Sequence, residues 1–260
     1  MVQYSDERDN IISTDLEENL AVIRKRLGNT SDLIIRKGKI GVLNHPFALI
    51  YLKGLINEDL VNTNILRVLE LNKKHIESNL FDTVYNEIIS IAEIDKQKDI
   101  NQVIKQLLAG NTAFLLEGEK EVILIGASGL EYRAIEEPKS ESVIRGSRVG
   151  FIENLKINVS LIRQEIKDPN LRIDQMEVGT DSNQKIAICY IEGKVKQEIL
   201  NEVVRRINTI DVNFTPDSGF IEQWIEDSSL SPFPQIVDTE RPDRVALNIL
   251  KGKIAIIVEG

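Results

Sequence analysis

The most concentrated polar cluster in the sequence is residues 239–244, TERPDR. A structural interpretation explains much of it, because Thr239 is suited to cap a helix, Pro242 to its first turn and Asp243 to the positive end of the helix dipole. This interpretation does not explain Arg241 and Arg244. They could pair with acids elsewhere in the domain or bind an anion. The candidate ligand or interface residues of this cluster are Glu240, Arg241, Asp243 and Arg244.

A second cluster, residues 145–153, reads RGSRVGFIE and combines two arginines with two glycines. Glycine permits unusual backbone angles and close approach of the chain, and arginines beside it could hold an anion. A hinge or salt-bridge node between two parts of the protein is the preferred interpretation. The candidate residues here are Arg145, Gly146 and Arg148.

Other residues with chemical potential lack the neighbours that catalysis or metal binding requires. Cys189 lies in an apolar run without an activating base, which predicts a buried core residue. Neither His45 nor His75 has a metal-ligand neighbour at helical spacing. Residues 126–129, GASG, are predicted to form a tight turn between strands rather than a phosphate loop. Trp224 lies at helical spacing from apolar neighbours, which favours core packing. We therefore predict no catalytic residue, no metal, no cofactor and no enzyme activity; a hydrolase or nucleotide enzyme is the least favoured alternative.

Composition limits the class of protein further. The 260 residues contain 41 acidic and 32 basic side chains, a net charge of −9, which argues against a nucleic-acid partner. One cysteine permits no internal disulfide. The polar N-terminus does not resemble a secretory signal, and no apolar run approaches the ~18 residues of a membrane span. We expect a water-facing polypeptide that does not itself span a membrane.

An internal duplication organises the chain. Residues 51–62 align without a gap with residues 190–201, at an offset of 139, and residues 103–118 align with residues 245–260, at an offset of 142. One shift of three residues relates the two matches. Both closing segments are predicted to be entered through a helix, a glycine and a strand, at Gly110 and Gly252.

Each half has the same predicted order of elements. Strands expected near residues 47–52 and 185–191 are almost continuously apolar, as for strands covered on both faces. Helices are predicted near residues 15–27, 57–71, 80–94 and 100–109, and near 151–167, 195–207, 218–226 and 241–251. The remaining predicted strands are residues 111–117, 121–125 and 253–259. The fold class is therefore α/β, with two homologous subdomains, each a small mixed sheet packed with helices.

The domain boundaries follow from the duplication and from a polar, turn-prone segment at residues 136–142. We expect a first subdomain over residues 1–128, a linker over 129–149 and a second subdomain over 150–260. The second copy stops at the equivalent of a hairpin turn, so we expect the natural protein to continue.

Three segments carry a resemblance to a known family: residues 231–235 (SPFPQ), 239–245 (TERPDRV) and 252–260 (GKIAIIVEG). Together they resemble the spore germination GerA family, the A subunits of nutrient germinant receptors in endospore-forming bacteria. The match covers most of residues 130–260. This chain has Ser147 and Val149 where the family usually has a proline and an acid, so a charge-pair role at position 149 is in doubt.

The resemblance implies an N-terminal domain that precedes membrane-spanning helices, in a receptor with B and C subunits in the inner spore membrane. We expect this domain to serve receptor assembly and signal transmission. The alternative is direct binding of a small nutrient, such as an amino acid or sugar, in a cleft between the halves. Self-association is a further option.

Overall fold

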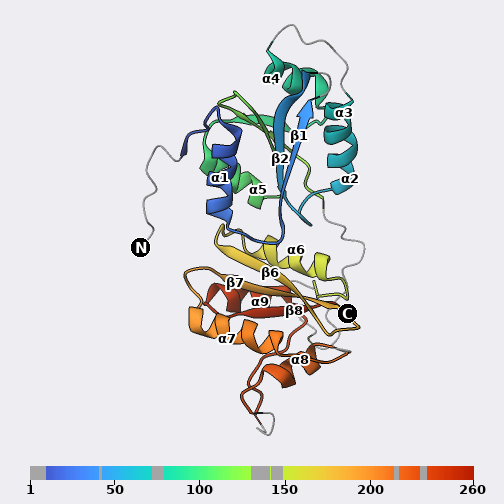
Figure 1. Ribbon diagram of the computed structural model, residues 1–260, viewed down its shortest axis with the longest axis vertical. Coiled ribbons are helices and arrows are strands. Elements are labelled where there is room, and N and C mark those ends of the chain that lie inside the picture. Colours follow the sequence, from blue (N-terminus) through green and yellow to red (C-terminus); the bar gives the residue numbers. More distant parts are fainter. Residues whose placement is uncertain are drawn as a thin grey trace. The chain divides into compact units, whose positions relative to one another are not determined.

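The chain divides into two compact units, shown in the ribbon view of the computed structural model (Figure 1). The structure describes residues 10–40, 43–71, 79–129, 141, 149–213, 217–228 and 233–260. The first unit contains the residues up to Leu130 together with Lys167–Pro169, and the second contains the others. The expected linker falls largely outside the described residues and stays a prediction.

The first unit is built on a five-stranded sheet with the order β1-β2-β4-β5-β3. Its elements are α1 (Leu16–Leu27), β1 (Leu33–Ile40), β2 (His45–Leu52), α2 (Glu58–Val61), the π-helical segment η3 (Asn62–Leu66), α3 (Arg67–Glu70), α4 (Leu80–Thr83), the π-helical segment η4 (Val84–Ile88), β3 (Ile94–Gln97), α5 (Ile100–Leu108), β4 (Thr112–Leu116) and β5 (Val122–Ile125).

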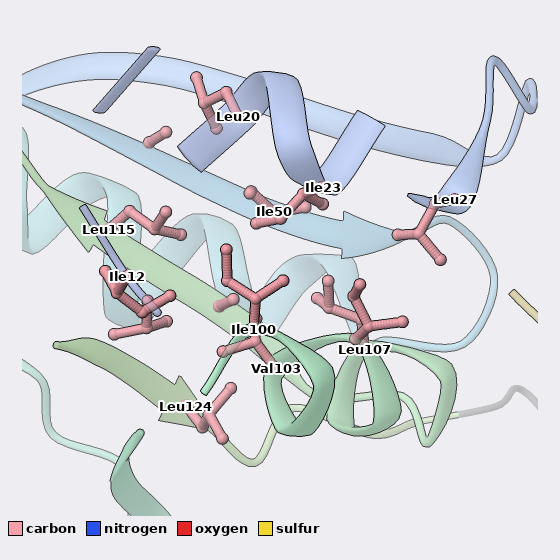
Figure 2. Packing of buried hydrophobic residues seen from close by; sticks show 14 of the residues in the cluster. Ile12, Leu20, Ile23, Leu27, Ile50, Ile100, Val103, Leu107, Leu115 and Leu124 are labelled. Atoms are coloured by element: carbon pink, nitrogen blue, oxygen red, sulfur yellow. The ribbon is translucent and has the colours of Figure 1, made fainter. Parts of the chain in front are cut away.

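Both faces of this sheet are covered. Along β2, Ala48 and Ile50 pack in the cluster formed with α1 and α5, whereas Phe47 and Leu49 pack in the cluster on the opposite face, with α2, η3, α3 and α4. Figure 2 shows the first cluster, in which Ile50 lies between side chains of the two helices. Successive side chains of a strand point to opposite faces, so a strand between two helical layers must be apolar at every position.

The second unit repeats the arrangement on a three-stranded sheet with the order β6-β7-β8. Its elements are α6 (Leu155–Glu165), β6 (Leu171–Val178), β7 (Gln184–Ile191), α7 (Gln197–Asn208), α8 (Ser218–Ile225), α9 (Pro242–Leu250) and β8 (Ala255–Val258). Helices α6 and α9 pack on one face, and α7 and α8 pack on the other.

The predicted α/β class is confirmed, with one difference in the sheets. Every pairing between the described strands is antiparallel, so the sheets are not mixed. The near-continuous apolar runs of β2 and β7 result from coverage by helices on both faces, which does not require parallel neighbours.

The duplication is present in the register of the strands. Phe47 lies opposite Leu116 in the first unit, and Ile186 lies opposite Val258 in the second. Adding 139 to 47 gives 186, and adding 142 to 116 gives 258, the same offsets that relate the sequence repeats. The two copies therefore share strand pairing, not only element order.

In each unit, a buried asparagine forms hydrogen bonds with the backbone that precedes the first helix. Asn19 accepts a hydrogen bond from the Ser13 backbone N–H at 2.8 Å and donates one to the Ser13 carbonyl at 2.7 Å. Asn158 does the same with the backbone of Ile152, accepting at 2.8 Å. Both asparagines are at most 3% exposed. A buried amide with its partners satisfied fixes the turn that precedes the helix.

Two glycines occupy equivalent positions after α5 and α9, as predicted. Gly110 and Gly252 have φ of +93° and +88°, in the left-handed region that favours glycine. A Cβ on Gly252 would lie 2.9 Å from the Lys194 carbonyl oxygen, and one on Gly110 would lie 3.0 Å from that of Leu55. Both conformation and space therefore require glycine at these turns.

Some local predictions were wrong. The helix expected over residues 80–94 ends at Ile88, and β3 follows, in which Ile94 pairs with Ile125 of β5. Residues 126–129 do not form a tight turn, because Ser128 forms a bridge with Ile56. Trp224 is 41% exposed instead of packed in the core, although its ring lies 5.9 Å from that of Phe220.

Replacing Asn158 with alanine is expected to destabilise the second unit by about 1–3 kcal/mol, because the Ile152 backbone groups lose their partner. Urea unfolding followed by the fluorescence of Trp224, the sole tryptophan, reports on this unit. The matched control is Asn201→Ala at an exposed position of α7, expected within about 0.5 kcal/mol of the parent. Equal midpoints for both variants would contradict the role of Asn158.

Gly252→Ala is expected to cost about 2 kcal/mol or more, because backbone strain of about 1–2 kcal/mol is joined by the contact with Lys194. Gly193→Ala separates the two effects, since Gly193 has φ +80° but nothing within 4 Å of an added Cβ. Thermal unfolding should rank Gly252→Ala as the less stable variant. The reverse order would show that the close approach is relieved at no cost.

Candidate functional site

The candidate site is the N-terminal end of α9, which holds the 239–244 cluster. Pro242 is the first helical residue and Asp243 lies in the first turn, as predicted. The N-cap residue is Arg241, with extended backbone (φ −100°, ψ 114°), and not Thr239. Thr239 instead accepts a hydrogen bond from the Arg241 N–H at 3.2 Å. The predicted capping role was wrong because the helix begins two residues later than a Thr239 cap requires.

Arg241 and Asp243 form a two-point ion pair. The guanidinium donates from Nε to Asp243 Oδ1 at 3.0 Å and from Nη2 to Oδ2 at 2.5 Å. The hydrogen bond from Arg241 lowers the pKa of Asp243 below its ordinary value, and the same bond raises the pKa of Arg241. Asp243 also accepts from the Arg244 N–H at 2.9 Å, so one carboxylate serves the arginine and the helix start together.

Arg244 pairs with Glu141, a residue 103 positions earlier in the chain. The same carboxylate accepts a hydrogen bond from the Thr239 hydroxyl. Within the second arginine cluster, the Phe151 N–H donates to the Glu240 carbonyl at 2.8 Å. The start of α9 is thus bound to residues on both sides of the sequence segment 142–148. We call Glu141, Thr239, Arg241, Asp243 and Arg244 the α9 node.

The structure brings together four of the seven predicted site residues. Glu240, Arg241, Asp243 and Arg244 lie together at the start of α9. Arg145, Gly146 and Arg148 lie outside the described residues. Sequence reasoning missed Glu141, for which the only signal was an acid in the polar segment preceding the second half.

The equivalent helix start in the first unit is built differently. Asp99 caps α5 by accepting from the Asn101 N–H at 2.8 Å. Asn101 in turn accepts a hydrogen bond from Arg26 of α1. Position 99 plus the offset of 142 is position 241, so an arginine replaces a capping aspartate in the second copy. The α9 node is therefore a departure from the shared design of the two units.

A second charged cluster ties α7 to the end of α8. Arg206 donates to Glu202 Oε1 at 2.7 Å, to the Ile225 carbonyl at 2.5 Å and to Asp227 Oδ1 at 2.5 Å. Hydrogen bonds from Arg205 and Arg206 lower the pKa of Glu202 to about 2. Because these charged side chains are paired within the chain, the cluster is explained as the contact that holds the end of α8 against α7.

Tyr190 of β7 is a partly buried phenol with a raised pKa. Burial and a 3.0 Å hydrogen bond to Asp174 Oδ2 raise its pKa to about 12. The phenol therefore remains a hydrogen-bond donor across the β6–β7 pair, which is a structural role.

The remaining chemical candidates have structural partners. Cys189 is buried in β7, as predicted. His45 lies in β2, with Nε2 2.7 Å from the Glu117 carbonyl oxygen, whereas His75 lies outside the described residues. The N–H groups of Gly126 and Gly129 donate to the carbonyls of Glu93 and Leu55, so they are not directed at a phosphate.

The described part of the chain holds neither a candidate membrane span nor a candidate metal site. Within it, no helix combines the length and the apolar character needed to cross a membrane. In those same residues, histidine, cysteine, aspartate and glutamate do not gather in groups of three or more that could hold a metal ion.

Comparison with known proteins identifies the family. The family model described as Bacillus/Clostridium GerA spore germination protein matches residues 21–260. The chain belongs to the GerA family. The resemblance expected over most of residues 130–260 thus extends to residues 21–260, including most of the first unit.

Named relatives of this GerA-family chain are spore germination proteins. Spore germination protein KA of Bacillus subtilis (strain 168) is 36% identical over 259 residues, which cover 99% of this chain and 48% of that protein. Spore germination protein GerLA of Bacillus cereus is 36% identical over 246 residues, covering 95% of this chain and 50% of that protein. The chain spans about half the length of these curated relatives.

A solved structure shares the fold. The crystal structure of the N-terminal domain of the A subunit of the Bacillus megaterium spore germinant receptor GerK3 matches with a TM-score of 0.74 and 28% identity. The match covers 96% of this chain and 93% of that one. The two-unit α/β architecture is therefore the fold of this GerA-family region.

The Arg241–Asp243 pair predicts a pH-dependent contribution to stability. Because the native pKa of Asp243 is lowered, its contribution is full above the unfolded pKa of about 3.9 and is lost as pH falls through the lower native value. Asp243→Asn is expected to destabilise the domain at pH 7 by less than about 1 kcal/mol, since the pair is partly exposed. Urea midpoints of parent and variant should converge below pH 4; a constant difference would exclude the ion pair as the cause.

Proposed function

We propose that this chain is the N-terminal domain of a spore germinant receptor A subunit and acts in nutrient-triggered spore germination. The proposal is supported by the GerA family match and by the fold shared with the GerK3 A-subunit domain. In this proposal the domain is not an enzyme, the full-length protein resides in the inner spore membrane, and its partners are the receptor B and C subunits.

Within the receptor, we propose that the domain serves assembly and signal transmission. The observation that carries this choice is the pairing of both node arginines with carboxylates of the chain itself, Arg241 with Asp243 and Arg244 with Glu141. An arginine that already binds a carboxylate offers an anionic ligand fewer N–H donors and a largely compensated charge, which lowers affinity. The pairing supports a structural link over a free anion site.

The α9 node offers a route for such transmission. Glu141 and Phe151 flank residues 142–148 in sequence, and both are bound to the start of α9. Val245 and Ile249 of α9 pack in the core cluster with α6 and β7. A displacement of the chain near Glu141 therefore acts on α9, which is packed against the sheet, and is not confined to the residues beside Glu141.

A charge exchange tests this role. Arg244→Glu is expected to slow nutrient-triggered germination several-fold, because the introduced carboxylate would repel Glu141. Combining Arg244→Glu with Glu141→Arg restores the pair in reverse and should restore germination, measured as the loss of optical density of a spore suspension. Arg205→Ala, which removes an exposed ion pair on α7, is the control and should germinate normally.

Receptor abundance must be measured in the same spores by immunoblot, so that a folding defect is recognised. If the reversed pair accumulates normally and fails to germinate, Arg244 has a role that the pairing does not explain, as expected for direct binding of a nutrient carboxylate. Calorimetric titration of the domain with germinants then decides that alternative, because binding must release or absorb heat.

A further inference from the structure

The edge of β8 differs from that of its counterpart in the first unit. Strand β4 lies between β2 and β5, whereas β8 pairs with β7 and with no other strand in the described part of the second unit. The pairing of β8 with β7 has the same register as that of β4 with β2. The second sheet therefore presents its edge at the position that β5 covers in the first.

The side chains around this edge are less buried than their counterparts in the first unit. All five residues of β4 are buried, but of the four residues of β8 only Ile257 is. Leu250 of α9 is 41% exposed, and the equivalent Leu108 of α5 is 4% exposed. In the first unit, Val122 and Leu124 of β5 belong to the core cluster that contains Leu108. Among the described residues of the second unit, no strand takes the place of β5.

The sequence of the edge argues against permanent exposure. Residues 254–258 read IAIIV, with no charge and no proline. Natural proteins protect sheet edges with charges, prolines or bulges, because an apolar edge is a template for aggregation. An unprotected edge of this composition is typical of a strand that pairs on both sides.

The turn after β8 indicates which strand covers the edge. In the first unit, the Gly118 N–H donates to the Thr14 carbonyl at 2.8 Å, and the chain then enters β5. In the second unit, the Gly260 N–H donates to the Glu153 carbonyl at 2.9 Å. Both glycines have positive φ, +85° and +113°. The same turn is thus started at the same place in both units.

We infer that the free edge of β8 binds an antiparallel strand of the same polypeptide, supplied by the residues that follow Gly260 in a protein of the relatives' length. Curated relatives extend to about twice the length of this chain. On β4, the partners of Thr112 and Leu115 are Ile125 and Val122, the seventh and fourth residues after Gly118. The same register places the fourth residue after Gly260 opposite Ile257 and the seventh opposite Ile254.

The occupant must be apolar on both faces. Val122 and Leu124 of β5 pack on the α5 side, and Ile123 and Ile125 pack on the opposite side. A strand on β8 would cover Leu250 on one face and extend the cluster containing Ile256 and Val258 on the other. Such a strand would connect the second unit to the part of the polypeptide that follows the strand. The inference does not depend on the proposed function.

A second copy of the chain is the competing occupant. Two β8 strands paired antiparallel about Ile256 would place Lys253 opposite Glu259 at both ends, which is a favourable cross-strand arrangement. The two occupants differ in concentration dependence, because only self-pairing requires association.

Hydrogen exchange tests the inference on two polypeptides, the 260-residue chain and the full-length protein in detergent. Alternate amides of residues 255–258, the ones that point away from β7, are expected to exchange at least about tenfold more slowly in the longer protein, because they form ladder hydrogen bonds with the added strand. Amides of β4 serve as the internal control and should exchange alike in both. Equal rates for β8 in the two polypeptides would overturn the inference.

Disulfide formation tests the register independently. In the longer protein, Ile257→Cys should cross-link under mild oxidation with a cysteine at the fourth residue after Gly260, and not with one at the fifth, which faces the other side. Cross-linking between two copies would assign the edge to self-pairing, as would slow exchange in the 260-residue chain that depends on concentration. Either result would overturn the inference.

Discussion

The structure depends on one constraint, the coverage of a central antiparallel strand by helices on both faces. β2 and β7 carry apolar side chains that alternate between two core clusters, and every major helix of each unit is placed by the need to cover one of them. Burial of this kind is the dominant favourable contribution to folding. Helix α9 is positioned by Val245 and Ile249 within such a cluster, so the charged node at its first turn rests on apolar packing.

Comparison of the two copies separates packing residues from residues with other roles. Strand register, the buried asparagines and the turn glycines coincide at fixed offsets, because any change there disturbs the shared core. The copies differ at Asp99 and Arg241, where a self-contained cap is replaced by an ion-pair node. They also differ in the long helix after the central strand, which contains the π-helical segment η3 in the first unit and is regular in α7. Packing of the shared core does not explain these departures.

The sequence was sufficient for the elements that packing dictates and insufficient where single contacts decide. Helices α1, α5 and α9 and strands β2 and β7 have periodic or continuous apolar patterns, and all were predicted within a few residues. β3 contains one apolar residue, Ile94, and exists because β5 offers it an edge. The partner of Arg244, Glu141, lies 103 positions away and has no local pattern to reveal it. The prediction that Trp224 packs in the core was wrong because helical spacing shows which face of α8 is apolar, but not how far the neighbouring elements cover that face.

The α9 node and the edge of β8 can both be compared with their counterparts in the first unit. Both lie in the second unit, and both involve α9. At the equivalent positions of the first unit, Asp99 caps the helix and β5 covers the edge of the strand. In the second copy, the node depends on a residue distant in sequence, Glu141, whereas the edge, in our inference, is covered by residues that follow Gly260 at the same spacing that separates β5 from Gly118. In our proposal for this GerA-family domain, α9 is therefore the element that connects a displacement near Glu141 with the chain that follows β8.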